Sequence, residues 1–310
     1  MIKKLTIPVD HGNWNMKTKH FIFKTGLALA DRKPEGQEEF LQTGERYYVL
    51  SDRRIPYQRN KTQDERFSVL TDFAIAKELE RTGEVTKEDV VEVSLPIGLP
   101  PKHYAELAGK YRTYFLGDGK VRKLIYKGKT YNICLQDVAV YPQAYAAMMT
   151  KQEIIRKIPK VVGIDIGGFT TDILMMRKGI PCLDYCYSME KGVITMYNEI
   201  ISAVNGDHDI LLEEIDINSI LEGKTEYYPE DVVHTVERMA RNFVTDLLSS
   251  VRELGIDTKS TYTVFIGGGA ILLREFLEKS SRLVKYQFID DIFANAKGYE
   301  ILYRSMQAGK

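Results

Sequence analysis

The sequence of 310 residues has little of several features that mark whole classes of protein. Its 43 basic and 43 acidic side chains cancel, so the basic excess typical of direct nucleic-acid binding is missing. It has three cysteines, an odd number without the spacing of a zinc site or a disulfide framework. No hydrophobic run approaches the roughly 20 residues of a membrane span. These absences argue against a membrane protein, a disulfide scaffold and direct nucleic-acid binding, and they favour a cytoplasmic location.

The composition is that of an ordinary globular protein, with 44% hydrophobic and 28% charged residues. Disorder requires low hydrophobicity together with high net charge, and neither is present. A single hydrophobic core stops growing at about 250–300 residues. The length therefore predicts two domains of roughly 150 residues each.

A strand–turn–strand pattern occurs twice, at residues 5–24 and again at residues 161–177. In each copy an aspartate stands at the end of the first strand, Asp10 in one and Asp165 in the other. The two aspartates are about 155 residues apart, half the chain, which indicates an internal duplication. Hydrophobic spacing predicts helices at 66–81, 102–109, 143–158, 192–204, 232–254, 270–278 and 292–308, and strands at 90–95, 121–126, 129–135, 138–141 and 261–266. Residues 31–46 are polar and predict a loop or a small variable subdomain.

The first turn has the residue types of a phosphate-binding turn. Glycine lets backbone N–H groups approach a ligand, and successive N–H groups form an anion-binding nest. Lys17 adds a positive charge, and Asp10 is placed to hold a hydrated Mg²⁺. The alternative is an ordinary polar hairpin turn. The residues concerned are Asp10, His11, Gly12, Asn13, Trp14, Asn15, Met16 and Lys17.

The second turn repeats this chemistry. Its glycines admit phosphate oxygens, its threonines offer N–H and hydroxyl donors, and Asp165 supplies a second carboxylate for Mg²⁺ or for an attacking water. The alternative is a structural hairpin. The turn runs through Asp165, Ile166, Gly167, Gly168, Phe169, Thr170, Thr171 and Asp172.

A third glycine-rich element, Gly267-Gly268-Gly269-Ala270, lies between a predicted strand and a predicted helix. It allows a flat ring or a phosphate to press on the backbone at a helix N-terminus, or it is simply a tight connection. The P-loop, dinucleotide-fold, HExxH and GxSxG patterns are all absent from the sequence. Cys182 and Cys186 are interpreted as core thiols.

The order of these three turns resembles that of the actin-like nucleotide-binding superfamily, and in particular the ParM/StbA-type bacterial actins of plasmid segregation. The resemblance covers nearly the whole chain. It rests on the three turns and on further short matches, namely Tyr48-Val49-Leu50, Asp64-Glu65-Arg66-Phe67, Gly98-Leu99-Pro100, Val140-Tyr141-Pro142-Gln143-Ala144 and Phe293-Ala294-Asn295-Ala296-Lys297-Gly298-Tyr299.

The resemblance implies an α/β, actin-like fold with two duplicated ribonuclease H-like domains and a nucleotide cleft between them. Domain I would comprise residues 1–158 joined by a C-terminal helix at about 292–310, and domain II residues 159–291. The resemblance also implies ATP or GTP with Mg²⁺, clamped by the turns at 10–17 and 165–172. Gly267 to Ala270 would border the base and ribose.

Gln143 lies where actins carry a glutamine, so the resemblance implies that it positions the attacking water. Asp165 and Asp10 would assist through water-bound Mg²⁺. A solvated helix N-terminus is the alternative for Gln143. Trp14, the single tryptophan, is expected to report on nucleotide binding.

The family resemblance implies a filament-forming nucleotide triphosphatase that moves plasmid DNA through a DNA-bound adaptor, with itself as its main partner. The alternative is a sugar or small-acid kinase of the same superfamily, which needs a carboxylate base facing an acceptor hydroxyl. A chaperone-type protein would require a substrate domain after the last helix. A membrane-tethered scaffold would require an amphipathic C-terminal helix, and residues 304–310 are too short and polar for that.

Overall fold

The computed structural model describes residues 1–34 and 39–309, and part of the predicted 31–46 loop lies outside them. The chain divides into two compact units, Met1–Thr150 with Phe293–Lys310, and Lys151–Ile292. The sequence had placed this division after residue 158. Residues 151–158 belong to the second unit, where Arg156 lies beside Gly179.

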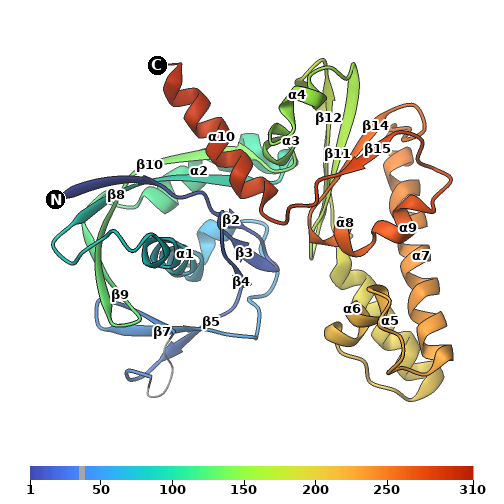
Figure 1. Ribbon diagram of the computed structural model, residues 1–310, viewed down its shortest axis with the longest axis horizontal. Helices are drawn as coiled ribbons and strands as arrows, with labels where there is room; N and C mark the ends of the chain where they lie inside the picture. Colours follow the sequence, from blue (N-terminus) through green and yellow to red (C-terminus); the bar gives the residue numbers. More distant parts are fainter. Residues whose placement is uncertain (35–38, 310) are drawn as a thin grey trace. The chain divides into compact units, whose positions relative to one another are not determined.

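The first unit is built on a seven-stranded sheet in the order β1-β8-β10-β9-β6-β7-β5. Its first three strands are parallel. The strands are β1 (Ile2–Thr6), β5 (Leu27–Ala30), β6 (Phe40–Thr43), β7 (Arg46–Leu50), β8 (Val90–Leu99), β9 (Arg122–Tyr126) and β10 (Lys129–Pro142). Figure 1 shows this sheet curving around helix α1 (Arg66–Thr82).

Helix α1 fills the concave side of the sheet because apolar residues occur on most of its faces. Phe67, Leu70 and Phe73 are fully buried and belong to one core with residues of β8 and β10. Residues 70–76 are all buried, so the middle of α1 is enclosed on every side. The remaining helical segments of this unit are η1 (Lys61–Gln63), η2 (Pro101–His103), α2 (Tyr104–Leu116), α3 (Tyr145–Met149) and α10 (Ala294–Ala308).

A small antiparallel sheet extends the first strand of this unit. It consists of β2 (Asp10–His11), β3 (Asn15–Lys17) and β4 (Ile22–Lys24). A bridge between Val9 and Ile97 joins it to β8 in the parallel direction. From the edge inward, the local order is therefore β4, β3, β2 with β1, β8 and β10, so the two strands after the first are followed inward by two parallel strands from later in the chain.

The second unit has the same order, β13-β12-β11-β14-β15. Its first three strands pair antiparallel, and β11 pairs parallel with β14. The strands are β11 (Lys160–Ile166), β12 (Thr171–Arg177), β13 (Ile180–Met189), β14 (Tyr262–Ile266) and β15 (Tyr286–Phe288). The shared order confirms the α/β class and the duplicated strand pattern.

The helices of the second unit include α7 (Glu230–Glu253), the longest in the described residues. Its Val236, Ala240, Val244, Leu247 and Val251 are buried, and this spacing of three to four residues matches the predicted helix. The others are α4 (Gln152–Ile155), α5 (Val193–His208), α6 (Glu214–Leu221), α8 (Gly268–Leu272) and α9 (Arg274–Glu278). Within the described residues, no helix combines the length and the apolar character that crossing a membrane requires.

Several predicted elements differ from the structure. The helix expected at 143–158 is broken into α3 and α4, because residues 150 and 151 turn between them. The helix expected at 102–109 extends to Leu116, and the strands expected at 129–135 and 138–141 form one strand with an irregularity between Leu135 and Asp137. The predicted 31–46 loop contains β6 and the start of β7, which pair with each other across a short turn, and β6 also pairs with the distant β9.

Helix α10 packs closely on α3 at Gly298, where a Cβ atom would collide with the backbone carbonyl of Ala146. We therefore expect Gly298→Ala to destabilise the protein by about 2 kcal/mol or more, since backbone cannot easily yield. Gly109 in α2 is the matched control, because nothing lies within contact distance of a Cβ there. Gly109→Ala is expected to stabilise by about 0.5–1 kcal/mol. Urea unfolding of both variants measures the difference, and equal effects would contradict the close approach.

Candidate functional site

The first turn is held in place by Thr25 and by a neighbouring segment, residues 51–58. The Thr25 hydroxyl donates to the Gly12 carbonyl at 2.7 Å, and the backbone N–H of Gln58 donates to Asn13 Oδ1 at 3.1 Å. Arg54 stacks its guanidinium 3.4 Å from the centre of the Trp14 ring and donates from Nε to the Trp14 carbonyl. This stacking adds a positive charge beside the turn, which the sequence analysis did not assign.

Asp10 joins three segments of the first unit through its side chain. Its side chain is buried, at 4% exposure. Oδ1 accepts hydrogen bonds from Gln143 Nε2 at 2.8 Å and from the Tyr299 hydroxyl at 3.3 Å. Strand β2 supplies the aspartate, the segment after β10 the glutamine, and α10 the tyrosine. Segments far apart in sequence thus converge on one carboxylate.

Gln143 is fixed by an unusual backbone turn. Ala144 has φ 58° and ψ −51°, and the Tyr145 N–H donates to the Gln143 carbonyl at 2.6 Å. This is a γ-turn of the rare, strained kind for a residue other than glycine. The Ala144 N–H donates to Asn295 Oδ1, and the Gln143 N–H donates to the Leu99 carbonyl. Such strain persists only where the surrounding contacts over-determine it, and it concentrates at functional positions.

His11, the residue after Asp10, is a neutral structural contact. It is 1% exposed, its ring lies 4.4 Å from that of Phe115, and Nε2 lies 2.8 Å from the Thr71 hydroxyl. That hydroxyl donates to the Phe67 carbonyl, so His11 Nε2 must carry the proton and donate. Burial, together with the charge of Lys61, lowers the pKa of His11 to about 3. The bulky residue thus anchors the turn to α1.

In the second unit, the turn after Asp165 is fixed on the start of α5. The Val193 N–H donates to the Gly167 carbonyl at 3.1 Å, and the Ile194 N–H donates to the Gly168 carbonyl at 2.9 Å. The Gly167 N–H donates to the Thr170 carbonyl and closes the turn. The sequence predicted the helix but not its contact with this turn.

The two threonines of this turn differ. Thr171 is buried, and its hydroxyl donates to the Lys191 carbonyl at 2.5 Å, so the protein already uses that donor. Thr170 is partly exposed, and its hydroxyl lies 3.4 Å from Asp172 Oδ2. The expectation of a hydroxyl donor to a ligand therefore fits Thr170 better than Thr171.

The glycine-rich turn lies directly beside Asp165. Ile266 pairs with Asp165 in the parallel ladder, and Gly267 follows with φ 90°. A Cβ at Gly267 would collide with Asp165 Oδ1, so only glycine fits there. Gly268 is exposed, whereas Gly269 and Ala270 are buried. Of this motif, Gly268 is therefore the part open to a ligand, and Gly269 and Ala270 pack beneath it.

The described residues hold no group of three or more His, Cys, Asp and Glu side chains that could cage a metal ion. Mg²⁺ bound with a nucleotide needs no such cage, because it keeps several waters and takes one or two carboxylates. Among the described residues, Gln143 and Tyr299 both donate to Oδ1 of Asp10 and neither of them to Oδ2. Its donor set therefore fits a water-bridged Mg²⁺.

The structure brings the predicted residues together within each unit. In the first unit these are the turn at 10–17 and Gln143, and in the second unit the turn at 165–172 and residues 267–270. Sequence reasoning missed the roles of Arg54, Asn295 and Tyr299. The last two lie in a segment that the family resemblance had picked out, but nothing in the sequence linked them to Asp10 or Gln143.

Two family models match the chain. The one described as "Actin like proteins N terminal domain" matches residues 9–145, and the one described as "Archaeal actin homologue MreB-like, C-terminal" matches residues 163–279. No curated protein sequence matches. These findings, together with the repeated strand order, define an actin-like protein.

Solved structures are similar over nearly the entire chain. The pSK41 ParM protein has a TM-score of 0.73 at 16% identity, covering 99% of both chains. Ta0583, an archaeal actin homologue also solved in complex with ADP, has a TM-score of 0.76 at 18% identity, covering 97% of this chain and 99% of its own. The Alp12 filament structure has a TM-score of 0.71 at 17% identity, covering 98% and 99%. These likenesses show the actin-like fold over nearly the whole chain, and they agree with the two actin-like family models and with the resemblance expected from the motifs.

The low pKa of His11 makes stability depend on pH. Between pH 6.5, the ordinary value, and pH about 3, the unfolded chain binds a proton that folded His11 does not. The contribution of His11 to the free energy of unfolding is therefore complete above pH 6.5. Below that, it falls by about 1.4 kcal/mol for each pH unit.

We expect His11→Gln, which keeps a donor for Thr71, to flatten this slope in urea unfolding between about pH 5 and pH 6.5. Burial and nearby cations also lower the pKa of His103, so its effect on stability has the same sign. His103 is present in both proteins, and the difference between their slopes therefore comes from His11. The exposed His234→Gln is the control. An unchanged slope in His11→Gln would contradict the neutral, buried assignment.

Proposed function

We propose that this protein is an actin-like nucleotide triphosphatase that binds ATP or GTP with Mg²⁺ and polymerises into filaments. Its cellular role would be to segregate plasmid DNA through a DNA-bound adaptor. The observation that carries the proposal is the pair of buried strand-end aspartates, each followed by a glycine turn at the same place in a duplicated unit. Asp10 and Asp165 are 4% and 8% exposed.

Gln143 is the residue we propose to orient the attacking water. Its Nε2 donates to Asp10, which fixes the direction of the amide and leaves Oε1 as an acceptor for a water proton. The γ-turn at Ala144 and the Asn295 contact hold the backbone beneath it. A pre-positioned amide of this kind suits phosphoryl transfer, which depends mainly on positioning and electrostatics.

The turns supply the binding groups. In the first unit, the backbone of Gly12 to Asn15 with Lys17 would take phosphate oxygens, and Arg54 adds positive charge beside Trp14. In the second unit, the proposed phosphate contacts are those of Gly167, Gly168 and Thr170. When bound, Mg²⁺ would neutralise phosphate charge, held through water by Asp10 and Asp165. Gly267 and Gly268 are proposed to lie against the nucleoside.

The filament part of the proposal draws on the structural relatives. The Alp12 relative is described as a filament, and the archaeal relative was solved with ADP. The balanced charge of this chain, 43 basic and 43 acidic side chains, allows copies to stack without net repulsion.

The proposal predicts polymer that depends on Mg²⁺ and nucleotide, followed by light scattering and pelleting beside phosphate release. Asp165→Ala is expected to lose turnover by at least about a hundredfold, because the buried carboxylate would serve the metal. The exposed Asp184→Ala is the control and should behave as wild type. Near-normal phosphate release from Asp165→Ala would refute the site. Hydrolysis that stays soluble and accelerates with added sugars would favour the kinase alternative.

Gln143→Ala is expected to slow hydrolysis about ten- to a hundredfold while nucleotide affinity changes less than about threefold, because the amide orients water rather than phosphate. Affinity is measured by Trp14 fluorescence and hydrolysis by single-turnover phosphate release. Gln136→Ala, an exposed glutamine in β10, is the matched control. Equal losses of binding and turnover would count against a water-positioning role.

A further inference from the structure

A second polar site lies in the first unit, apart from the turn at 10–17. It is a hollow of about 190 Å³ bordered by β1, the turn after β3, the end of α1, and α10. Its floor is apolar, formed by Leu5, Ile7, Pro8 and Leu79, and its rim carries Lys19, His20, Arg81 and Arg304. We call it the basic groove.

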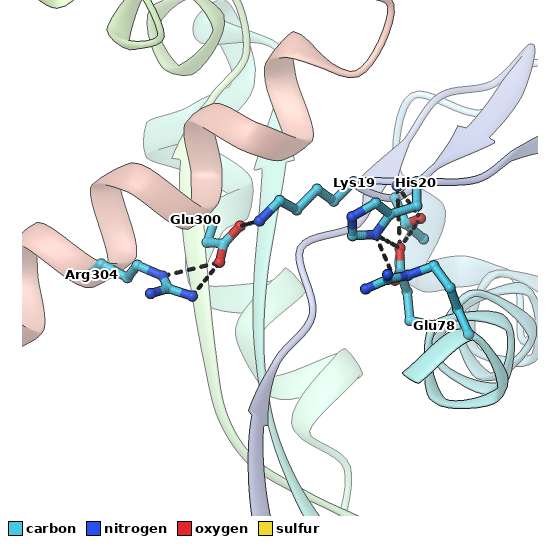
Figure 2. Close-up of polar contacts among 7 residues, drawn as sticks. Lys19, His20, Glu78, Glu300 and Arg304 are labelled. Atoms are coloured by element: carbon cyan, nitrogen blue, oxygen red, sulfur yellow. Dashed lines mark hydrogen bonds and ion pairs between the residues drawn. The ribbon is translucent and has the colours of Figure 1, made fainter. Parts of the chain in front are cut away.

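On one side of the basic groove, two cations share Glu300. Lys19 Nζ lies 2.9 Å from Oε2, while Arg304 donates to Oε1 from Nε at 3.0 Å and from a terminal nitrogen at 2.6 Å (Figure 2). Burial alone would raise the pKa of Glu300, but the hydrogen bonds from Lys19 and Arg304 outweigh it and lower the pKa. Glu300 is therefore a fixed negative charge.

On the other side, Glu78 is shared in the same way. His20 Nδ1 lies 2.8 Å from Oε2, Arg81 Nε donates to the same oxygen at 3.2 Å, and the Thr18 hydroxyl donates to Oε1. Figure 2 shows His20 and Glu78 at the opposite end of the cluster from Arg304. Each buried carboxylate thus has two basic neighbours.

The two carboxylates are buried, and the cations that pair with them face solvent. The side chains of Glu78 and Glu300 are 8% and 10% exposed, whereas those of Lys19, Arg81 and Arg304 are 40%, 45% and 71% exposed. Three permanent cations thus cover two carboxylates, so the groove keeps a net positive charge even with His20 neutral. Arg81 uses only Nε, which leaves its terminal nitrogens without a protein partner among the described residues.

We propose that the basic groove is a docking site for an acidic segment of a protein partner, and that its occupation is communicated to Asp10. Arginine presents paired donors that match a carboxylate. The apolar floor favours a protein segment over a free anion, because an apolar side chain beside the carboxylates would be buried there. This link to Asp10 rests on the proposed nucleotide site.

Two short stretches of the chain connect the basic groove to Asp10. Glu300 of the groove follows Tyr299, whose hydroxyl donates to Asp10, on helix α10. Lys19 lies two residues after Lys17, which pairs with Asp10 in the small sheet. A partner carboxylate competing with Glu300 for Lys19 would loosen the ion pair that holds α10 to the turn after β3. The Tyr299–Asp10 contact would weaken with it.

Docking is tested first without nucleotide. The probe is a fluorescein-labelled peptide of alternating glutamates and leucines, with a glutamine-for-glutamate peptide as its control, measured by fluorescence anisotropy on the full chain. We expect the acidic peptide alone to bind, and added salt to weaken it. Arg304→Gln and Arg81→Gln should each weaken it about tenfold, and the exposed Arg238→Gln should not.

The link to Asp10 is tested by titrating nucleotide against Trp14 fluorescence with and without the peptide. The peptide should weaken nucleotide binding at least about fivefold, and nucleotide should weaken peptide binding by the same factor. Tyr299→Phe should retain peptide binding but lose this coupling.

The possible outcomes distinguish the docking site, its link to Asp10 and the proposed function from one another. Equal binding of the glutamine peptide, displacement by inorganic phosphate at millimolar concentration, or no loss in both arginine variants would overturn the docking site. Peptide binding that leaves nucleotide affinity unchanged would overturn the link. Failure of nucleotide binding itself, with peptide binding intact, would refute the proposed function and the link but not the docking site.

Discussion

The carboxylate of Asp10 accepts hydrogen bonds at one oxygen from Gln143 and Tyr299, and much of the first unit is arranged to make these contacts possible. A buried carboxylate is costly unless its oxygens are hydrogen-bonded, and a bond to a charged group contributes about 1.5–3 kcal/mol. The strained turn at Ala144 and the docking of α10 are both fixed by contacts around this group. The same contacts that satisfy the charge also position the proposed water-orienting amide.

In the second unit, a buried aspartate occupies the equivalent position. Asp165 again lies at the end of the first strand, and the glycine turn at Gly267 passes directly beside its Oδ1. Duplication thus preserved the strand order and the carboxylate. The proposed roles are catalysis around Gln143 in the first unit and nucleoside contacts around Gly267 and Gly268 in the second.

The sequence predicted the elements whose signal is local. The helix at α7 followed from apolar spacing, and the two strand–turn–strand copies from alternation and turn residues, because these patterns depend on near neighbours. The break between α3 and α4 and the strands within 31–46 were missed. Strand β6 pairs with β7 across a short turn and also with the distant β9, and no local pattern records that second partner.

The sequence by itself determined the class of protein, because three glycine turns in a fixed order and an aspartate at each strand end are carried by consecutive residues. Only the tertiary structure decided which side chains meet. Asp10 and Tyr299 are 289 residues apart, and Arg54 lies 40 residues from the tryptophan it covers. The basic groove likewise joins the turn after β3, α1 and α10. Such contacts arise when the sheet and helices pack, since burial and hydrogen bonding select partners by position in space and not by distance along the chain.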